Sequence, residues 1–341
     1  MPRDEPSTSR ASRARRSHRE NSVPTDTAEP ALELHTQQFV DGLADAPPIY
    51  SLSPADARSV LTRAQSIPVG KPSAQIEDIA FPVGPTGSVP VRIVRPASTV
   101  EVLPVVLYFH GGGWILGDQD THDRLVREIA VGAKAAVVFV NYARSPEARY
   151  PVAIEQAYAA TRYVVDNGAS LRIDPLRVAV AGDSVGGNMA AAVSLMANQR
   201  RGPKIIFQVL FYPVTDAQFD TPSYIRFANG PWLTKRAMQW FWDAYLPDPA
   251  IRKQPTATPL SASLDELAGL PEALVIVDEN DVLRDEGEAY ARKLSNAGVR
   301  VTSTRYNGTI HDFVMLNALA DTPATRGAIA QATSALTGAL G

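Results

Sequence analysis

The sequence contains no cysteine and no long apolar run. With no cysteine among its 341 residues, the chain has no disulfide bridge, no thiolate nucleophile and no zinc or iron–sulfur site held by cysteine. The longest apolar runs, such as 105–109 and 135–140, fall far short of the ~18 residues that a membrane span requires. The formal net charge is only −3, which gives no reason to expect a nucleic-acid partner. We therefore expect neither nucleic-acid binding nor stable membrane insertion.

The composition is that of a globular protein. Hydrophobic residues make up 45% of the chain and charged residues 20%, which argues against a disordered, collagenous or coiled-coil protein. A chain of this length buries enough surface to fold without disulfides or structural metals. At ~150 residues per domain, the length alone suggests about two domains.

The first 28 residues differ from the rest. The first twenty hold six arginines against three carboxylates and almost no large apolar side chain, so they predict a disordered basic arm over 1–28. No apolar stretch of about 7–15 residues follows the arginines, as a secretory signal would require. A twin-arginine signal at Arg15 and Arg16 lacks that stretch as well. A cytoplasmic location is the resulting expectation.

Strand and helix patterns alternate from residue 31 onward. The interior strands are continuous Val/Ile/Leu runs, which is typical of parallel strands covered on both faces. The alternation predicts an α/β fold, a doubly wound and mostly parallel sheet of about eight strands that opens with a hairpin. Strands are expected over Gln75–Val83, Val89–Val94, Leu103–Phe109, Ala136–Asn141, Val178–Ala181, Ile205–Phe211, Ala273–Val277 and Val299–Arg305. Helices are expected over 31–45, 54–66, 122–133, 151–166, 186–200, 286–297 and 323–339.

One segment interrupts this alternation. Residues 215–260 contain three of the four tryptophans and a helical pattern over 233–246. We expect them to form a helical cap over the sheet together with residues 29–70. The catalytic domain then comprises 71–214 and 261–341.

A sharp strand-to-helix turn is predicted around Ser184. The pentapeptide Gly182-Asp183-Ser184-Val185-Gly186 follows an apolar strand and opens a helix. Glycines two residues either side allow the close approach that a strained nucleophile turn needs, and the helix N-terminus supplies partial positive charge. The alternative is a glycine-rich connection in which the serine caps the helix. In this strand–turn–helix context Ser184 is the candidate nucleophile.

A second glycine cluster follows the strand Leu103–Phe109. The cluster is His110-Gly111-Gly112-Gly113-Trp114. Ordering three consecutive glycines costs much backbone entropy, which is understandable where backbone N–H groups must point at a ligand. We assign the N–H groups of Gly112, Gly113 and Val185 as oxyanion donors, and His110 as a brace for the loop. The alternatives are a flexible loop or a phosphate-binding turn. A phosphate loop would be followed directly by a helix, whereas Trp114-Ile115-Leu116-Gly117 follows here.

Serine catalysis also needs a base and an acid. Of the five histidines, His311 follows the last strand and should lie at the carboxyl edge of the sheet with Ser184. The acid that fixes its tautomer should come from the loop after Ala273–Val277, where Asp281 fits best. Asp285 is interpreted as a helix N-cap and Asp278 as a hydrogen-bond acceptor at the strand end. The chain order Ser184, Asp281, His311 is the order of α/β-hydrolases.

Over residues 31–340 the sequence resembles the hormone-sensitive-lipase-like branch of the α/β-hydrolase superfamily, the bacterial esterase/lipase group with an HGGG loop. The motifs that carry the resemblance are His110–Trp114, Gly182–Asn188, Asp281–Gly287, His311–Phe313 and Tyr142–Glu147 followed by Tyr150-Pro151. Three positions depart from the family pattern. Val185 replaces alanine and is expected to narrow the pocket, Val282 replaces proline and is expected to loosen the acid loop, and Asp312 replaces glycine beside the base.

The resemblance implies a serine carboxylic ester hydrolase that uses no cofactor and no metal. It implies an acyl-enzyme mechanism on small-molecule esters with short or medium chains, inside a capped pocket whose walls include Trp114 and Tyr212. A homodimer is an option by analogy with similar enzymes. An amide or peptide hydrolase would use the same triad and remains an alternative. A non-catalytic small-molecule receptor on this scaffold is disfavoured because His311 is present.

Overall fold

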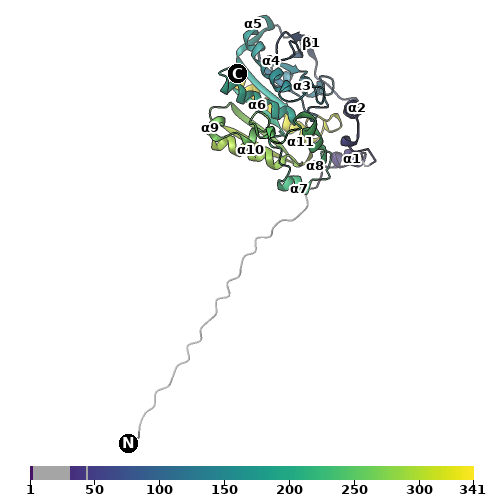
Figure 1. Cartoon of the computed structure of the whole chain (residues 1–341), viewed down its shortest axis with the longest axis vertical. Coiled ribbons are helices and arrows are strands. Elements are labelled where there is room, and N and C mark those ends of the chain that lie inside the picture. The colour runs from purple at the N-terminus through teal and green to yellow at the C-terminus, as the bar shows by residue number, and fades with distance from the viewer. Residues whose placement is uncertain (3–30, 44) are drawn as a thin grey trace.

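The computed structural model describes residues 1–2, 31–43 and 45–341 (Figure 1). The basic arm predicted over 1–28 lies outside the described residues, apart from the first two. No helix in the described part of the chain is both long and apolar enough to cross a membrane.

A sheet of eight strands forms the centre of the described molecule, in the order β1-β2-β4-β3-β5-β6-β7-β8. β2 pairs antiparallel with β1 and β4, while all the other neighbours run parallel. This confirms the predicted α/β fold with its leading hairpin. The strands are β1 (Ala74–Phe81), β2 (Val89–Pro96), β3 (Leu103–Phe109), β4 (Ala136–Val140), β5 (Ile173–Asp183), β6 (Phe207–Phe211), β7 (Glu272–Asn280) and β8 (Val301–Ile310).

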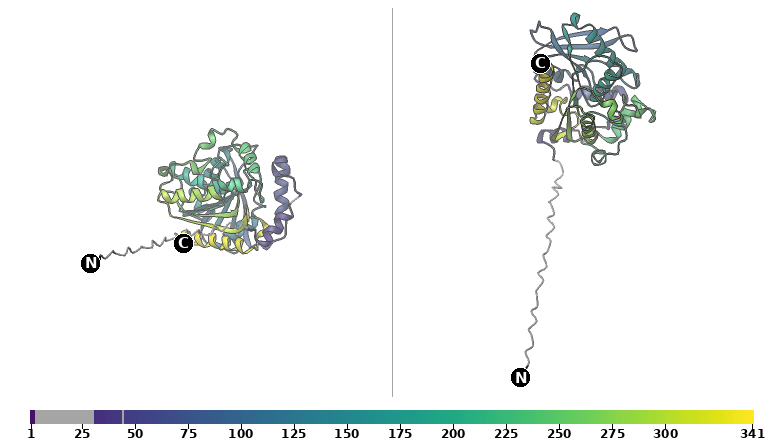
Figure 2. Two further views of the ribbon diagram at one scale, coloured as in Figure 1. Left: turned by 90° about the horizontal axis from the view of Figure 1, so that it is seen from below. Right: turned by 90° about the vertical axis from the view of Figure 1, so that its left-hand side faces the viewer.

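Helices cover both faces of the sheet. Helices α3 and α11 contact each other on one face, and α4, α6 and α10 lie on the other, an arrangement that Figure 2 shows edge-on. The helices are α1 (Leu34–Asp41), α2 (Pro54–Ala64), α3 (Asp123–Gly132), α4 (Val152–Asp166), α5 (Gly168–Leu171), α6 (Val185–Gln199), α7 (Pro222–Arg226), α8 (Lys235–Tyr245), α9 (Leu264–Leu267), α10 (Arg284–Asn296) and α11 (Pro323–Leu340).

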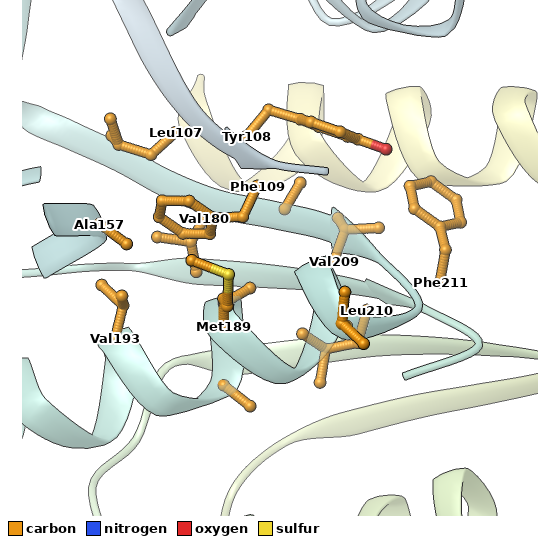
Figure 3. Close-up of a cluster of buried hydrophobic side chains, with 14 of the residues drawn as sticks. Leu107, Tyr108, Phe109, Ala157, Val180, Met189, Val193, Val209, Leu210 and Phe211 are labelled. Atoms are coloured by element: carbon orange, nitrogen blue, oxygen red, sulfur yellow. The ribbon is translucent and has the colours of Figure 1, made fainter. Parts of the chain in front are cut away.

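The core lies where α6 crosses the middle strands. Every residue of β3, β4 and β6 is buried, as continuous apolar runs predict for strands covered on both faces. Figure 3 shows Met189 and Val193 of α6 packed against this layer, close to Phe109 and Val180. Because α6 is anchored in this way, its first residue is held at the carboxyl edge of β5.

Two segments far apart in sequence pack together beside the sheet. In the first, Ser53 caps α2 by accepting from the N–H of Asp56, with Pro54 at the first helical position, as its sequence indicates. In the second, Thr234 caps α8. The ring of Phe39 in α1 lies 5.4 Å from that of Trp232. The boundaries proposed for the cap and the catalytic domain stay predictions.

The last strand is longer than its sequence pattern indicates. The segment 306–310, expected to be a loop, belongs to β8, which runs on to Ile310. β8 is an edge strand whose residues are mostly polar and half exposed, so it lacks the apolar run that marks the interior strands. The consequence is that His311 follows a paired strand end directly instead of lying within a loop.

Candidate active site

Ser184 lies on a sharp turn between β5 and α6. Its backbone has φ 55° and ψ −120°, a strained conformation of the kind that is held at functional sites by its surroundings. Its N–H donates to the carbonyl of Phe211 over 2.9 Å. A Cβ on Gly186 would collide with the carbonyl oxygen of Phe109, so the turn closes only with glycine there. The side chain of Ser184 makes no capping bond to α6, which is against the alternative of a simple N-cap serine.

The structure brings Ser184, His311 and Asp281 together in one hydrogen-bonded chain. Nε2 of His311 lies 2.9 Å from Oγ of Ser184, and Nδ1 lies 2.8 Å from Oδ2 of Asp281. Ser184 is 3% exposed and His311 2%. A carboxylate at Nδ1 assigns the ring proton to that nitrogen and leaves the Nε2 lone pair facing the serine. The other oxygen of Asp281 accepts from the N–H of Leu283 over 3.0 Å, which fixes the carboxylate.

A further carboxylate lies beside the base. Oδ1 of Asp312 lies 3.5 Å from Nε2 of His311, and Oδ2 accepts from Nε1 of Trp232 over 2.9 Å. Burial lowers the pKa of His311, but the nearby Asp281 and Asp312 outweigh that effect and raise it to about 9. Burial in turn raises the pKa of Asp312. The departure from glycine at this position therefore places a second acid on the reacting side of the imidazole.

The two other acids of the same loop behave differently from their sequence interpretation. Asp285 is not the N-cap of α10, because Leu283 occupies that position and Asp285 lies in the first turn. Its carboxylate accepts from the N–H of Ser223 over 2.7 Å instead. Asp278 is not a strand-end acceptor: it is buried, and neither of its oxygens has a hydrogen-bond partner among the described residues. Both interpretations are wrong because the helix begins earlier and β7 continues further than the pattern indicates.

The glycine loop after β3 presents free backbone donors. Gly112 and Gly113 have positive φ values of 97° and 62°, and no hydrogen bond within the described residues uses their N–H groups. The N–H of Gly111 is committed, since it donates to Oδ1 of Asp183 over 3.0 Å. Val185 is the first residue of α6, where an N–H has no acceptor inside the helix. The three predicted donors are therefore available for an anionic oxygen.

His110 lies directly beneath this loop. Its Nδ1 donates to the carbonyl of Gly111 over 2.8 Å, and its ring stacks on Tyr142 at 4.2 Å between centroids. The hydroxyl of Tyr142 donates to the carbonyl of His110 over 2.8 Å. Burial and the neighbouring His122 lower the pKa of His110 to about 3, so its ring is neutral. These contacts tie the His110 ring to the start of the glycine loop, and the bracing role itself stays a prediction.

A buried pair that sequence reasoning missed supports the turn and the loop together. Asp183 accepts from the hydroxyl of Tyr108 over 2.7 Å, and its second oxygen lies 3.3 Å from Nε2 of His122. Burial lowers the pKa of His122, but Asp183 more than offsets this and raises it. Burial raises the pKa of Asp183, and His122 more than offsets that effect too. The sequence pattern marks His122 only as the first residue of the helix expected over 122–133, because its partner Asp183 lies 61 residues away.

The segment after His311 is also fixed by buried side chains. Arg124 of α3 donates to the carbonyls of Val314 and Met315 over 2.8 and 2.9 Å. Gln65, just after α2, donates to the same Met315 carbonyl over 2.8 Å. The base is thus held by its strand on one side and by this pinned segment on the other.

The two predicted pocket residues lie in different surroundings. Tyr212 is buried beside the base, with its ring 4.9 Å from that of His311. Trp114 is buried against α8, stacked on Tyr245 at 4.0 Å and edge-on to Trp242 at 4.9 Å. The Trp114 contacts are those of core packing between the loop and α8. The wall roles of both residues stay predictions.

One group of three potential metal ligands lies close together among the described residues: Asp278, Asp281 and His311. Nδ1 of His311 carries the proton that bonds Asp281, so its lone pair is not available to a metal. These three residues are better explained as two acids that face the same imidazole nitrogen than as a metal-binding site.

The comparisons with known proteins agree with this geometry. Residues 106–315 match a family model described as alpha/beta hydrolase fold. The carboxylesterase NlhH of Mycobacterium tuberculosis is 40% identical over 259 residues, which cover 76% of this chain and 81% of the relative. The ethyl acetate hydrolase of Pseudomonas putida is 35% identical over 277 residues, 80% of this chain and 86% of the relative.

Solved structures give the same result over nearly the whole described chain. The crystal structure of a thermostable esterase from Pseudomonas putida ECU1011 superposes with a TM-score of 0.90 at 50% identity, covering 92% of this chain and 99% of that one. A structure from a study of two fungal esterases of Rhizomucor miehei gives 0.86 at 39% identity, covering 91% and 97%. The chain therefore belongs to the α/β-hydrolase family, in its hormone-sensitive-lipase-like branch.

Proposed function

We propose that this chain is a serine carboxylic ester hydrolase in which Ser184 is the nucleophile, His311 the general base and acid, and Asp281 the acid that orients the imidazole. Carboxylic ester hydrolysis is the activity that the family and the names of its relatives support. The single observation that carries the assignment to residues is the hydrogen-bonded chain from Ser184 through His311 to Asp281, with contacts of 2.9 and 2.8 Å.

Acylation begins when Oγ of Ser184 attacks the ester carbonyl carbon. Nε2 of His311 takes the hydroxyl proton as the new C–O bond forms, and the carbonyl electron pair moves to its oxygen. The N–H groups of Gly112, Gly113 and Val185 bind this oxyanion, each donor lowering the barrier by ~3 kcal/mol. As the intermediate collapses, the alkoxy bond breaks and the Nε2 proton passes to the leaving alcohol.

Deacylation repeats the cycle with water. Nε2 of His311 removes a proton from water, whose oxygen attacks the acyl carbon, and the proton then returns to Oγ of Ser184 as the carboxylic acid leaves. Throughout, Asp281 stabilises the imidazolium and keeps Nδ1 protonated. The bond from Leu283 prevents the Asp281 carboxylate from rotating away.

The substrate class we propose is a small ester with a short or medium acyl chain. The nucleophile is only 3% exposed, which favours compact substrates over emulsified fat. Tyr212 beside the imidazole, and Trp114 at the loop, are the proposed walls. One relative is named ethyl acetate hydrolase, which agrees with a short ester.

A chain-length series of p-nitrophenyl esters on the wild type and on Ser184→Ala tests the proposal. We expect turnover on short and medium chains that falls by at least ~10⁴-fold in the alanine variant. Turnover that survives in Ser184→Ala would place the chemistry elsewhere. Matched amide substrates run in parallel distinguish an esterase from the amide-hydrolase alternative, because the triad is common to both.

A further inference from the structure

Asp278 is a buried acid next to the triad that the proposed mechanism does not use. It lies in β7 and is 0% exposed, and neither carboxyl oxygen finds a hydrogen-bond donor in the described part of the chain. An isolated carboxylate in such a place is costly, because nothing replaces the water it has lost. Its Oδ2 is 4.0 Å from Nδ1 of His311, the same ring nitrogen that Asp281 contacts at 2.8 Å.

The strand pairing brings both acids to the same imidazole. Between β7 and β8 the register is regular up to Asp278, which pairs with Tyr306. It then shifts, so that Asn280 pairs with Ile310 and the extra residues of β8 bulge. The bulge delivers His311 beside the end of β7, where ligand atoms of Asp278, Asp281 and His311 all lie within 4.8 Å of one another.

The hydrogen bonds decide which acid carries the charge. Asp281 accepts from Nδ1 of His311 and from the N–H of Leu283, and both bonds stabilise a carboxylate. Asp278 has no such donors, so the proton of the pair belongs to Asp278. Burial, followed by the charge of Asp281, raises the pKa of Asp278 well above its usual range. The carboxylate of Asp281 lies close enough to accept a hydrogen bond from the O–H of neutral Asp278.

We propose that Asp278 is a reserve acid for His311: a positioning residue that holds Asp281 through its own proton, and a substitute that pairs with Nδ1 when Asp281 is absent. The inference rests on the proposed function, since it concerns the same imidazole. In the substitute state Asp278 loses its proton to solvent, and its Oδ2 moves about 1 Å closer to accept the Nδ1–H bond. The imidazole keeps its tautomer, so the base remains competent.

A merely space-filling acid would behave differently. It would contribute nothing to catalysis after Asp281 is removed, and an isosteric amide in its place would be silent in every background. The reserve role instead predicts that the effect of changing Asp278 depends on whether Asp281 is present, which a set of single and double variants measures.

The experiment compares kcat/KM for p-nitrophenyl acetate in Asp278→Asn, Asp281→Ala and the double variant. We expect Asp278→Asn to lower kcat/KM by about 3-fold, since the amide also donates to Asp281. Asp281→Ala should lower it by only ~100-fold, and the double variant by ~10⁴-fold, the loss seen when a triad acid no longer holds its histidine. Asp281→Ala should also acquire an acidic limb in its pH profile, from ionisation of Asp278 facing His311 and Asp312.

Two controls make the outcome decisive. Asp285→Asn changes a nearby acid that bonds Ser223 and does not face the imidazole, so adding it to Asp281→Ala should cause no further loss. If Asp281→Ala fails to fold, Asp281→Asn replaces it and should be equally sensitive to Asp278→Asn. If Asp281→Ala has a kcat/KM as low as that of the double variant, the reserve role is overturned. Failure of the proposed function would appear separately, as turnover that survives in Ser184→Ala.

Discussion

The carboxyl edge of the sheet and the proposed cap segments, residues 29–70 and 215–260, are held in place in different ways. At the edge, Asp183 alone ties together a strand, a helix and the glycine loop through Tyr108, His122 and the N–H of Gly111, all buried. The proposed cap segments are attached at separate points: Arg58 donates to the carbonyls of Ile115 and Ser145, and Trp232 donates to Asp312. The difference indicates that a connected buried network preorganises the turn and the glycine loop, while the proposed cap segments are joined to them one contact at a time.

The largest effect on activity is expected from a substitution that disrupts the turn at Ser184. Gly186→Ala places a methyl group against the carbonyl oxygen of Phe109, so the turn must open and kcat/KM should fall by at least ~10³-fold. Gly338→Ala in α11 is the matched control, because a Cβ there meets nothing within 4 Å. It should leave activity intact and raise the free energy of unfolding by about 0.5–1 kcal/mol. Equal losses in the two variants would contradict the steric explanation.

Breaking the buried network comes next. Asp183→Asn removes the charge facing His122 while keeping the shape, and loss of one partner of a buried pair typically costs about 3–5 kcal/mol. We expect a lower urea midpoint and an activity loss of about 100-fold, since the N–H of Gly111 loses its charged acceptor. The pair is also sensitive to acid: the lowered pKa of Asp183 means that its stabilising effect is present at neutral pH and disappears as pH falls through that value. The mutant should therefore lose less stability than the wild type on acidification.

An attachment of the cap should matter less. Arg58→Ala removes hydrogen bonds of 2.8 and 3.0 Å to Ile115 and Ser145, next to the glycine loop. We expect KM to rise about 10-fold with kcat changed by less than about 3-fold, because the triad itself is untouched. Glu147→Gln serves as the control. It removes only the charge of the Arg58 partner, whose side chain is 63% exposed, and should be close to silent. A kcat loss as large as the KM effect would mean that cap and edge are one unit.

The smallest change is a displacement of the pH profile. Asp312→Asn removes the charge 3.5 Å from Nε2 of His311, keeps an acceptor for Trp232 and tolerates the φ of 68°. The pKa of His311, raised to about 9 in part by Asp312, should fall, so the rising limb of kcat/KM against pH moves to lower pH by roughly one unit. Asp312→Gly should move it in the same direction. A profile that stays in place in both variants would make Asp312 irrelevant to the base.

The features that could be predicted from the sequence are those that depend on residues close together in the chain. Glycines mark the turn at Ser184 and the loop at Gly112, because these positions need a close backbone approach or a positive φ. The positions of the parallel strands follow from their apolar runs.

The features that could not be predicted from the sequence depend on contacts between residues far apart in the chain. The bond between Asp183 and His122 joins residues 61 apart, and no local pattern distinguishes His122 from a helix start. The length of the edge strand β8 could not be predicted either, because its residues are mostly polar and lack an apolar pattern. The approach of His311 to Asp278 follows from a register shift between β7 and β8, which depends on three-dimensional pairing rather than on composition.

One amide side chain closes the base of the long insertion between β6 and β7. Nδ2 of Asn188 in α6 donates to the carbonyl of Val214 over 3.0 Å, where the chain leaves the sheet, and to that of Ala257 over 2.8 Å, where it returns. Both ends of the insertion are thus hydrogen-bonded to α6, the helix that begins directly after Ser184. The intervening forty or so residues therefore leave and rejoin the rest of the chain at one point of α6, so the span of this insertion is set by a single side chain.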